Sequence, residues 1–155
     1  MVSGTSKFRY LLDTNIIVYL NDPQDIVRQM RANQLIIRLK TLQNAALPAQ
    51  VLAEFINVAV RKLKPHMDLR AIEQQIEGYI QDFTVLPLTQ EIVIEALQGV
   101  RNYQFSYYDA QIWAVARLHQ IPIVLSEDFN SGSTVGQVTF INPFDNTFDL
   151  TTLFP

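Results

Sequence analysis

The chain has 155 residues, a length typical of one domain, and 48% of them are hydrophobic, so it can bury a core without covalent cross-links. It contains no cysteine, which excludes a disulfide framework and a cysteine-based zinc site. The formal net charge of −3, from 12 basic and 15 acidic residues, differs from that of proteins that hold nucleic acid by bulk positive charge.

No apolar run in the sequence approaches the length of about 18 residues that marks a membrane-spanning helix. The first six residues lack the charged and apolar regions of a signal peptide. We therefore expect a cytoplasmic protein that makes no contact with a membrane.

The first predicted element is a short buried strand over residues 10–12, which ends at Asp13. Thr14 and Asn15 follow and can cap a helix that starts at Ile16. In an open α/β sheet the residue after a strand lies at the ligand crevice, so Asp13 is the first candidate site residue. The alternative is that Asp13 only forms a turn.

The rest of the chain alternates longer helices with short strands. The helices are expected over residues 22–43, 48–64, 68–83, 89–103 and 106–119, the first of them capped by Asp22 with Pro23 at its first position. The strands are expected over residues 45–47, 84–86, 123–125 and 138–141. Residues 126–136 are predicted to form a loop, and the phenylalanines of residues 142–155 predict a docked strap. This alternation favours a parallel α/β sheet between layers of helices.

Asp128 lies three residues after the predicted strand at 123–125. If that strand and the strand at 10–12 are parallel neighbours, Asp13 and Asp128 lie outside the same edge of the sheet. The alternative for Asp128 is a turn-forming residue.

Asp109 lies one turn into the helix that begins near Ser106. At helical spacing it shares a face with Ile112, Trp113 and Ala116, and this apolar face should point inward. A carboxylate there needs a partner, because an unpaired buried charge is costly. The alternative is a capping box with Ser106, and the two interpretations are compatible.

Glu54 lies within the helix expected over residues 48–64, at the edge of its core face and in line with Asn57 and Arg61. The alternative is an ordinary boundary glutamate. The expected core positions of this helix are Val51, Leu52, Phe55, Ile56 and Ala59.

Together, two acids follow strands and two lie on helix faces that border the core. Oxygen ligands without histidine or cysteine suit a hard cation, Mg²⁺ or Mn²⁺. Clustered carboxylates would otherwise repel one another. His66 and His119 stand alone in the sequence, and no phosphate-cradling glycine loop, nucleophile elbow or dinucleotide fingerprint is present.

At this point the chain resembles the PIN-domain family, and within it the VapC toxin nucleases of bacterial toxin–antitoxin pairs. The resemblance spans about residues 8–144. The motifs that carry it, in the order of the family, are Leu12-Asp13-Thr14-Asn15-Ile16-Ile17, Val51-Leu52-Ala53-Glu54-Phe55, Tyr108-Asp109-Ala110 and Leu125-Ser126-Glu127-Asp128.

The resemblance implies a three-layer sandwich with a short parallel sheet of about five strands. We expect a single PIN domain over residues 1–155, with its core at about 8–144 and a C-terminal strap at 145–155 that lies outside the shared pattern. It implies hydrolysis of RNA phosphodiester bonds, an antitoxin partner and a homodimer. By position, the acids that hold one or two Mg²⁺ or Mn²⁺ ions and carry catalysis are Asp13, Glu54, Asp109 and Asp128.

Several other residues receive roles from the same comparison. Asn15 and Ser126 match polar positions that support the metal ligands. Glu127 adjoins Asp128 and departs from the pattern, and Asp128 is preferred because it occupies the family position. Apart from the resemblance, Arg61 and Lys62 follow Glu54 in the sequence and are candidates for binding substrate phosphates, although a solvated helix end is the commoner explanation for each.

Three other functions remain open at this stage. A phospho-acceptor receiver module also clusters aspartates around Mg²⁺, but it needs a late lysine, and the last lysine here is Lys64. A housekeeping RNA-maturation nuclease and a non-catalytic module that binds RNA or protein would share the fold.

Overall fold

The computed structural model describes residues 6–155, and residues 1–5, where no signal peptide was predicted, lie outside the described part. Its strands are β1 Tyr10–Leu12, β2 Ala45–Pro48, β3 Thr84–Leu86, β4 Ile123–Leu125, β5 Thr134–Val135 and β6 Val138–Ile141. Its helices are α1 Thr14–Leu20, α2 Ile26–Leu42, α3 Ala49–Arg61, α4 Leu69–Asp82, α5 Gln90–Tyr103 and α6 Tyr107–Leu118, with a short 3-10 helix at Leu150–Thr152.

The strands form one sheet in the order β3-β2-β1-β4-β6-β5. All neighbours pair in parallel except β5, which pairs antiparallel with β6. The prediction of a short, mainly parallel sheet is confirmed, but β5 lies within the predicted loop at 126–136 and was missed. Because β1 and β4 pair in register, with Leu12 opposite Leu125, the residues that follow them emerge side by side.

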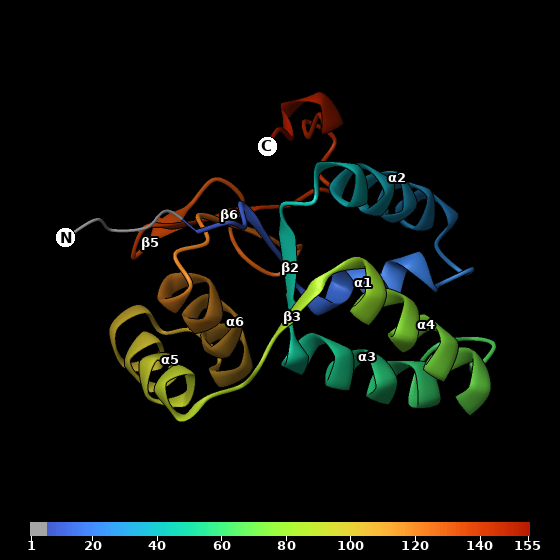
Figure 1. The fold of residues 1–155 in the computed structure, drawn as a ribbon, viewed down its shortest axis with the longest axis horizontal. Coiled ribbons are helices and arrows are strands. Elements are labelled where there is room, and N and C mark those ends of the chain that lie inside the picture. The colour runs from blue at the N-terminus through green and yellow to red at the C-terminus, as the bar shows by residue number, and fades with distance from the viewer. Residues whose placement is uncertain (1–5) are drawn as a thin grey trace.

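The helices cover both faces of the sheet, and Figure 1 shows α5 and α6 together on one side and α1 to α4 on the other. Helix α6 packs most deeply, because residues 110–116 are all buried. Ile56, which was expected in the core, is instead 40% exposed on α3. No helix within residues 6–155 combines the length and the apolarity needed to cross a membrane.

Two helix starts differ from the prediction. Helix α1 begins at Thr14, and Asp13 itself is its N-cap. Helix α2 begins at Ile26 rather than at Asp22, because Asp25 is the cap and its side chain accepts a hydrogen bond from Arg28 N at 3.1 Å. Asp22 instead accepts from Gln24 N at 3.0 Å and closes a turn before the helix.

The C-terminal strap is docked, as predicted. Leu153 is 2% exposed and joins the core. The Phe154 carbonyl accepts from Asn44 Nδ2 at 2.9 Å, and the Leu153 carbonyl accepts from Arg38 Nη2 at 3.2 Å. The strap therefore lies along α2 and the segment before β2, as the upper part of Figure 1 shows.

Two helical glycines give a matched test of packing. A Cβ added at Gly99 would lie 2.9 Å from the Trp113 ring, which is held by the Tyr103 ring and by a 3.0 Å hydrogen bond to the Val135 carbonyl. Gly99→Ala should therefore lower the free energy of unfolding by about 1–3 kcal/mol. Gly78→Ala meets nothing within 4 Å and should raise it by about 0.5–1 kcal/mol. Urea denaturation measures both, and a Gly99→Ala variant as stable as Gly78→Ala would contradict the packing described here.

Candidate active site

Asp13 lies where β1 meets α1 and is only 4% exposed. Its backbone N–H donates to the Leu125 carbonyl at 3.1 Å, which continues the pairing of β1 with β4. Its Oδ1 accepts from Thr14 N at 2.7 Å, and its Oδ2 accepts from Ser126 Oγ at 2.6 Å. The carboxylate is thus fixed at the carboxyl edge of the sheet.

Ser126, which directly follows β4, is fully buried and connects three site residues. Besides donating to Asp13, its hydroxyl oxygen accepts from Asp128 N at 3.0 Å and from Asn15 Nδ2 at 3.3 Å. Asn15 Oδ1 in turn accepts from Glu127 N at 3.4 Å. Asn15 and Ser126 therefore hold the loop after β4 against the start of α1.

Glu54 is half-buried on α3 and faces the same region. Its Oε2 accepts from Thr14 Oγ1 at 2.6 Å, and its Oε1 accepts from Gln50 Nε2 at 2.6 Å. Thr14 thus lies between two of the predicted acids, since its backbone N–H contacts Asp13 and its hydroxyl contacts Glu54.

Asp109 and Asp128 complete the predicted set. Asp109 is half-buried in the first turn of α6, and Asp128 is exposed in the loop after β4. The Ser106 side chain makes no capping hydrogen bond, so the alternative capping box does not account for Asp109.

The charges of the acids influence one another's pKa values. Burial raises the pKa of Asp13 to about 7, the hydrogen bonds from Ser126 and Thr14 oppose this rise, and the charges of Asp128 and Asp109 add to it. Burial also raises the pKa of Asp128, and Asp109 makes the largest charge contribution to that rise. The carboxylates therefore share one negative field that favours protons or a cation.

The donor chemistry of this region fits a hard cation, since it offers only oxygen ligands under mutual repulsion. Among the described residues, however, no three Asp, Glu or His side chains lie close enough to hold one ion. Hydrogen bonds occupy the oxygens of Asp13 and Glu54. A metal bound by several of the acids would have to replace some of these hydrogen bonds.

Glu127 points to different partners from Asp128. It accepts a short hydrogen bond from the Tyr19 hydroxyl and pairs with Arg28 Nε at 2.9 Å. Asp128, by contrast, is influenced by the charges of Asp109 and Glu54. This arrangement favours Asp128 over Glu127 as the acid of the site.

Sequence reasoning missed a chain of amides that links α6 to α3. Gln111 is 4% exposed, and its Nε2 donates to Gln50 Oε1 at 2.5 Å. Gln50 then donates to Glu54 and, at 3.2 Å, to the Tyr108 carbonyl. A polar residue among the apolar residues of α6 was the available signal for Gln111, because a buried amide needs partners.

Arg61 and Lys62 lie exposed at the end of α3. Arg61 is seven residues after Glu54, which is about 10 Å along the helix axis and on the same face. They remain candidates for binding substrate and lie outside the hydrogen-bonded cluster around Asp13.

Comparisons with known proteins identify the family and the fold. The family model described as PIN domain matches residues 10–131, which include all four acids. No curated protein matches the chain.

Similar folds occur among solved structures. A toxin-antitoxin complex from Klebsiella pneumoniae is 20% identical, with a TM-score of 0.61 over 86% of this chain and 97% of that one. VapC20 from Mycobacterium tuberculosis is described as a sarcin-ricin loop cleaving toxin. It is 19% identical, with a TM-score of 0.65 over 82% of this chain and 97% of that one. VapBC2 from Rickettsia felis, bound to a promoter DNA fragment, is 13% identical, with a TM-score of 0.60 over 84% and 96%.

The raised pKa of Asp13 makes stability depend on pH. The folded chain binds a proton at Asp13 up to about pH 7, whereas the unfolded chain releases it near pH 3.9, so without metal the folded state loses stability between these values as pH rises. The loss contributed by Asp13 is about 4 kcal/mol, from three pKa units at about 1.4 kcal/mol each. Asp13→Asn should remove this pH-dependent loss of stability, and the variant should be more stable than the wild type at pH 8.

Urea denaturation of both proteins in EDTA, from pH 5 to pH 8, measures this difference. Asn remains a good N-cap, so the helix start is preserved in the variant. Parallel pH profiles for the two proteins would contradict the burial of an ionisable Asp13.

Proposed function

The chain belongs to the PIN domain family, and on this premise we propose that it is a metal-dependent ribonuclease that hydrolyses phosphodiester bonds in RNA. The observation that carries the proposal is the buried Asp13, which shares one negative field with other acids at the carboxyl edge of the sheet. The residues proposed to bind Mg²⁺ or Mn²⁺ and to act in catalysis are Asp13, Glu54, Asp109 and Asp128.

The side chains around the acids have separate tasks in this proposal. Ser126 orients Asp13, and Thr14 and Gln50 orient Glu54. Asp128 is the most exposed of the four acids and has a raised pKa, so it is suited to accept the proton of the attacking water. When bound, a divalent cation supplies Lewis acidity at a phosphoryl oxygen and lowers the pKa of water.

We further propose that the chain is the toxin of a toxin–antitoxin pair in the cytoplasm, inhibited by an antitoxin and forming a homodimer. The support is the likeness to structures described as toxin–antitoxin proteins. Helix α2 also exposes large apolar side chains that a partner can cover, namely Ile26, Met30 and Ile37.

Asp13→Asn should lower the rate of Mg²⁺- or Mn²⁺-dependent RNA cleavage by at least about 100-fold, because it removes a charged metal ligand. Single-turnover cleavage of a labelled RNA measures the rate. Glu73→Gln, an exposed change of the same kind on α4, serves as the control and should cleave normally. Wild-type cleavage by Asp13→Asn would refute the assignment.

Divalent cations should stabilise the folded chain at pH 8, because they neutralise the acids that repel one another. At a Mg²⁺ concentration about 100-fold above its dissociation constant, the gain is about 2.7 kcal/mol. Thermal unfolding with Mg²⁺, and with NaCl at equal ionic strength, measures the gain. An equal gain in Asp13→Asn and in the wild type would place the cation elsewhere.

Expression of the chain alone in bacteria should arrest growth, because an uninhibited ribonuclease depletes essential RNA. Expression of Asp13→Asn at equal levels should not. Growth curves after induction compare the two, and normal growth with the wild-type chain would argue for a different cellular role.

A further inference from the structure

A hollow of about 870 Å³ lies at the amino edge of the sheet, opposite the edge that carries the acids. It is lined by the segments that lead into the strands, namely residues 6–9 before β1, Asn44 before β2, residues 120–122 before β4 and residues 136–138 at the start of β6. Its volume falls within the range of about 300–1,000 Å³ that is common for small-molecule sites. The proposed cleavage of RNA at the acids does not use this hollow.

The side chains that line the hollow include cations and no Asp or Glu, and the terminal residue Pro155 lines it as well. Lys7, Arg9 and Arg117 line it together with amide side chains, and no Asp or Glu does. Within residues 6–155, Lys7 and Arg9 form no ion pair. Arg117 pairs with Glu95 at 2.6 Å, and its Nη1 donates to the Gly136 carbonyl at 3.2 Å.

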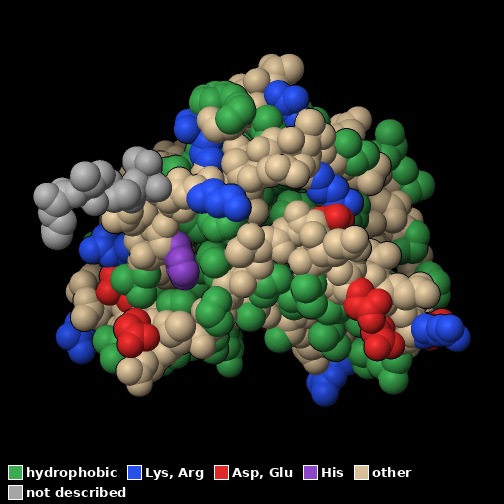
Figure 2. Space-filling view, viewed as in Figure 1, with side chains coloured by type: hydrophobic (Ala, Val, Ile, Leu, Met, Phe, Trp, Pro, Cys, Tyr) green, Lys and Arg blue, Asp and Glu red, His purple; other side chains and the backbone are tan. Residues whose placement is uncertain are grey.

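The carboxyl end of α6 also reaches the hollow and opposes an anion there. A helix end carries about half an elementary charge, which falls off within a turn. Two unpaired full cations outweigh it, so the hollow attracts anions. Figure 2 shows no continuous band of Lys and Arg across the face drawn there, so this positive charge is local rather than general.

Two buried polar atoms in the wall lack partners among the described residues. They are Arg9 Nε, a donor, and Asn44 Oδ1, an acceptor. The backbone holds these residues side by side, since Arg9 N donates to the Asn44 carbonyl at 2.8 Å. Buried polar atoms are almost always paired, so a ligand that brings both an acceptor and a donor would satisfy this wall.

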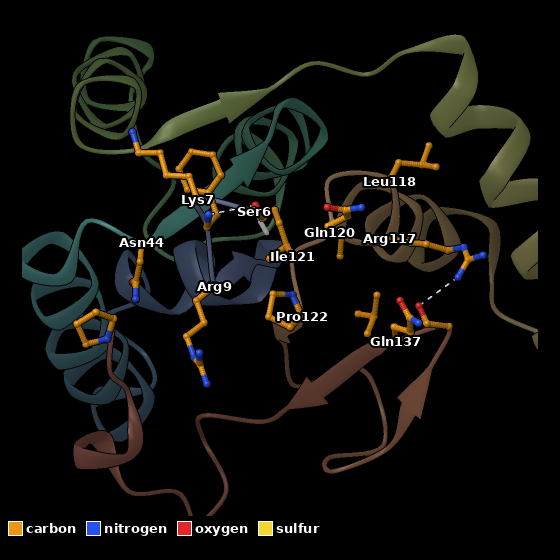
Figure 3. A pocket seen from close by; sticks show the side chains of 15 residues that line it. Ser6, Lys7, Arg9, Asn44, Arg117, Leu118, Gln120, Ile121, Pro122 and Gln137 are labelled. Carbon is orange, nitrogen blue, oxygen red and sulfur yellow. Dashed lines mark hydrogen bonds between the residues drawn. The ribbon is translucent and has the colours of Figure 1, made fainter. Parts of the chain in front are cut away.

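The Arg9 guanidinium is already ordered. Its Cζ lies 4.4 Å from the centroid of the Phe154 ring, in the docked strap. Stacking on an aromatic face leaves the N–H edge of a guanidinium free to bind phosphate oxygens in its plane. In Figure 3 the Arg9 and Asn44 side chains extend in the same direction from neighbouring segments.

We propose that this hollow binds a ribose phosphate. Arg9 takes the phosphate, Lys7 adds positive charge to the hollow, and a ribose hydroxyl donates to Asn44 Oδ1. A free nucleotide and a segment of single-stranded RNA offer the same chemistry. Arg9 and Asp13 lie four residues apart across β1, about 13 Å, so this site is separate from the proposed cleavage site.

The test uses the full chain with Asp13→Asn, which prevents cleavage. The probes are adenosine 5′-monophosphate, 2′,3′-dideoxyadenosine 5′-monophosphate, inorganic phosphate and an eight-nucleotide RNA. Calorimetry gives the affinities, and ¹⁵N NMR shifts locate the binding. The variant is Lys7→Gln with Arg9→Gln, and the charge-matched control is Arg70→Gln with Arg101→Gln, two exposed cations elsewhere.

We expect adenosine 5′-monophosphate to bind at least about 10-fold more tightly than either the dideoxy analogue or phosphate, because of these three probes only it brings ribose hydroxyl donors together with a phosphate. The NMR chemical shifts that adenosine 5′-monophosphate changes should belong to residues 7–9, 120–122 and 136–138. The pocket variant should weaken binding by about 10- to 100-fold, and the control should not. Thermal melting confirms that each variant is folded.

The RNA distinguishes the two sources. If RNA is the ligand, it should bind more tightly than the nucleotide. The Lys7→Gln, Arg9→Gln variant should then reduce the slope of log affinity against log salt concentration by about 1.4, for two phosphate contacts. Equal affinities for the RNA and for adenosine 5′-monophosphate would identify a free nucleotide as the ligand.

Three results would overturn the proposal: no saturable binding, equal loss in both double variants, or shifts confined to the strand ends at Asp13 and Asp128. Since cleavage is not measured, a negative result would leave the nuclease proposal intact.

Discussion

The carboxylate of Asp13 lies almost completely buried where β1 and β4 end side by side. Burying a charged carboxylate costs free energy, and the rest of the site is arranged around that cost. The parallel register of Leu12 with Leu125 fixes its position. Burial disfavours the charge and raises the pKa of Asp13 to about 7, and hydrogen bonds from Ser126 and Thr14 recover only part of the loss. The proposed Mg²⁺ or Mn²⁺ ion would stabilise the charged form.

The helices extend this arrangement away from the sheet. Gln111 on α6 holds Gln50 on α3, and Gln50 holds Glu54, so two helices that are distant in sequence set the position of one carboxylate. Lys7 and Arg9 lie in the segment before β1, at the opposite edge of the sheet. One short sheet thus separates a negative edge from a positive hollow, which a net charge of −3 does not suggest.

The sequence was most informative where local rules decide the structure. The strand ends, and the place of Asp13 directly after β1, could be predicted because they depend on short apolar runs and on the topology of a parallel sheet. The predicted start of α2 at Asp22 was wrong because Asp22 and Asp25 are both good caps. The structure uses Asp25, which bonds Arg28, and Arg28 also pairs with Glu127 from the loop after β4. The two-residue strand β5 depends on its pairing with β6 and has no periodicity of its own.

The partners of the acids could not be predicted in the same way, because the hydrogen bond between Gln111 and Gln50 joins residues that are brought together only by the fold. The most direct test of the central claim is anomalous diffraction from a crystal soaked in Mn²⁺. The account predicts a peak in contact with Asp13 and with at least one of Glu54, Asp109 and Asp128. A peak held by Glu127 without Asp13, or no peak among the four acids at saturating Mn²⁺, would contradict it.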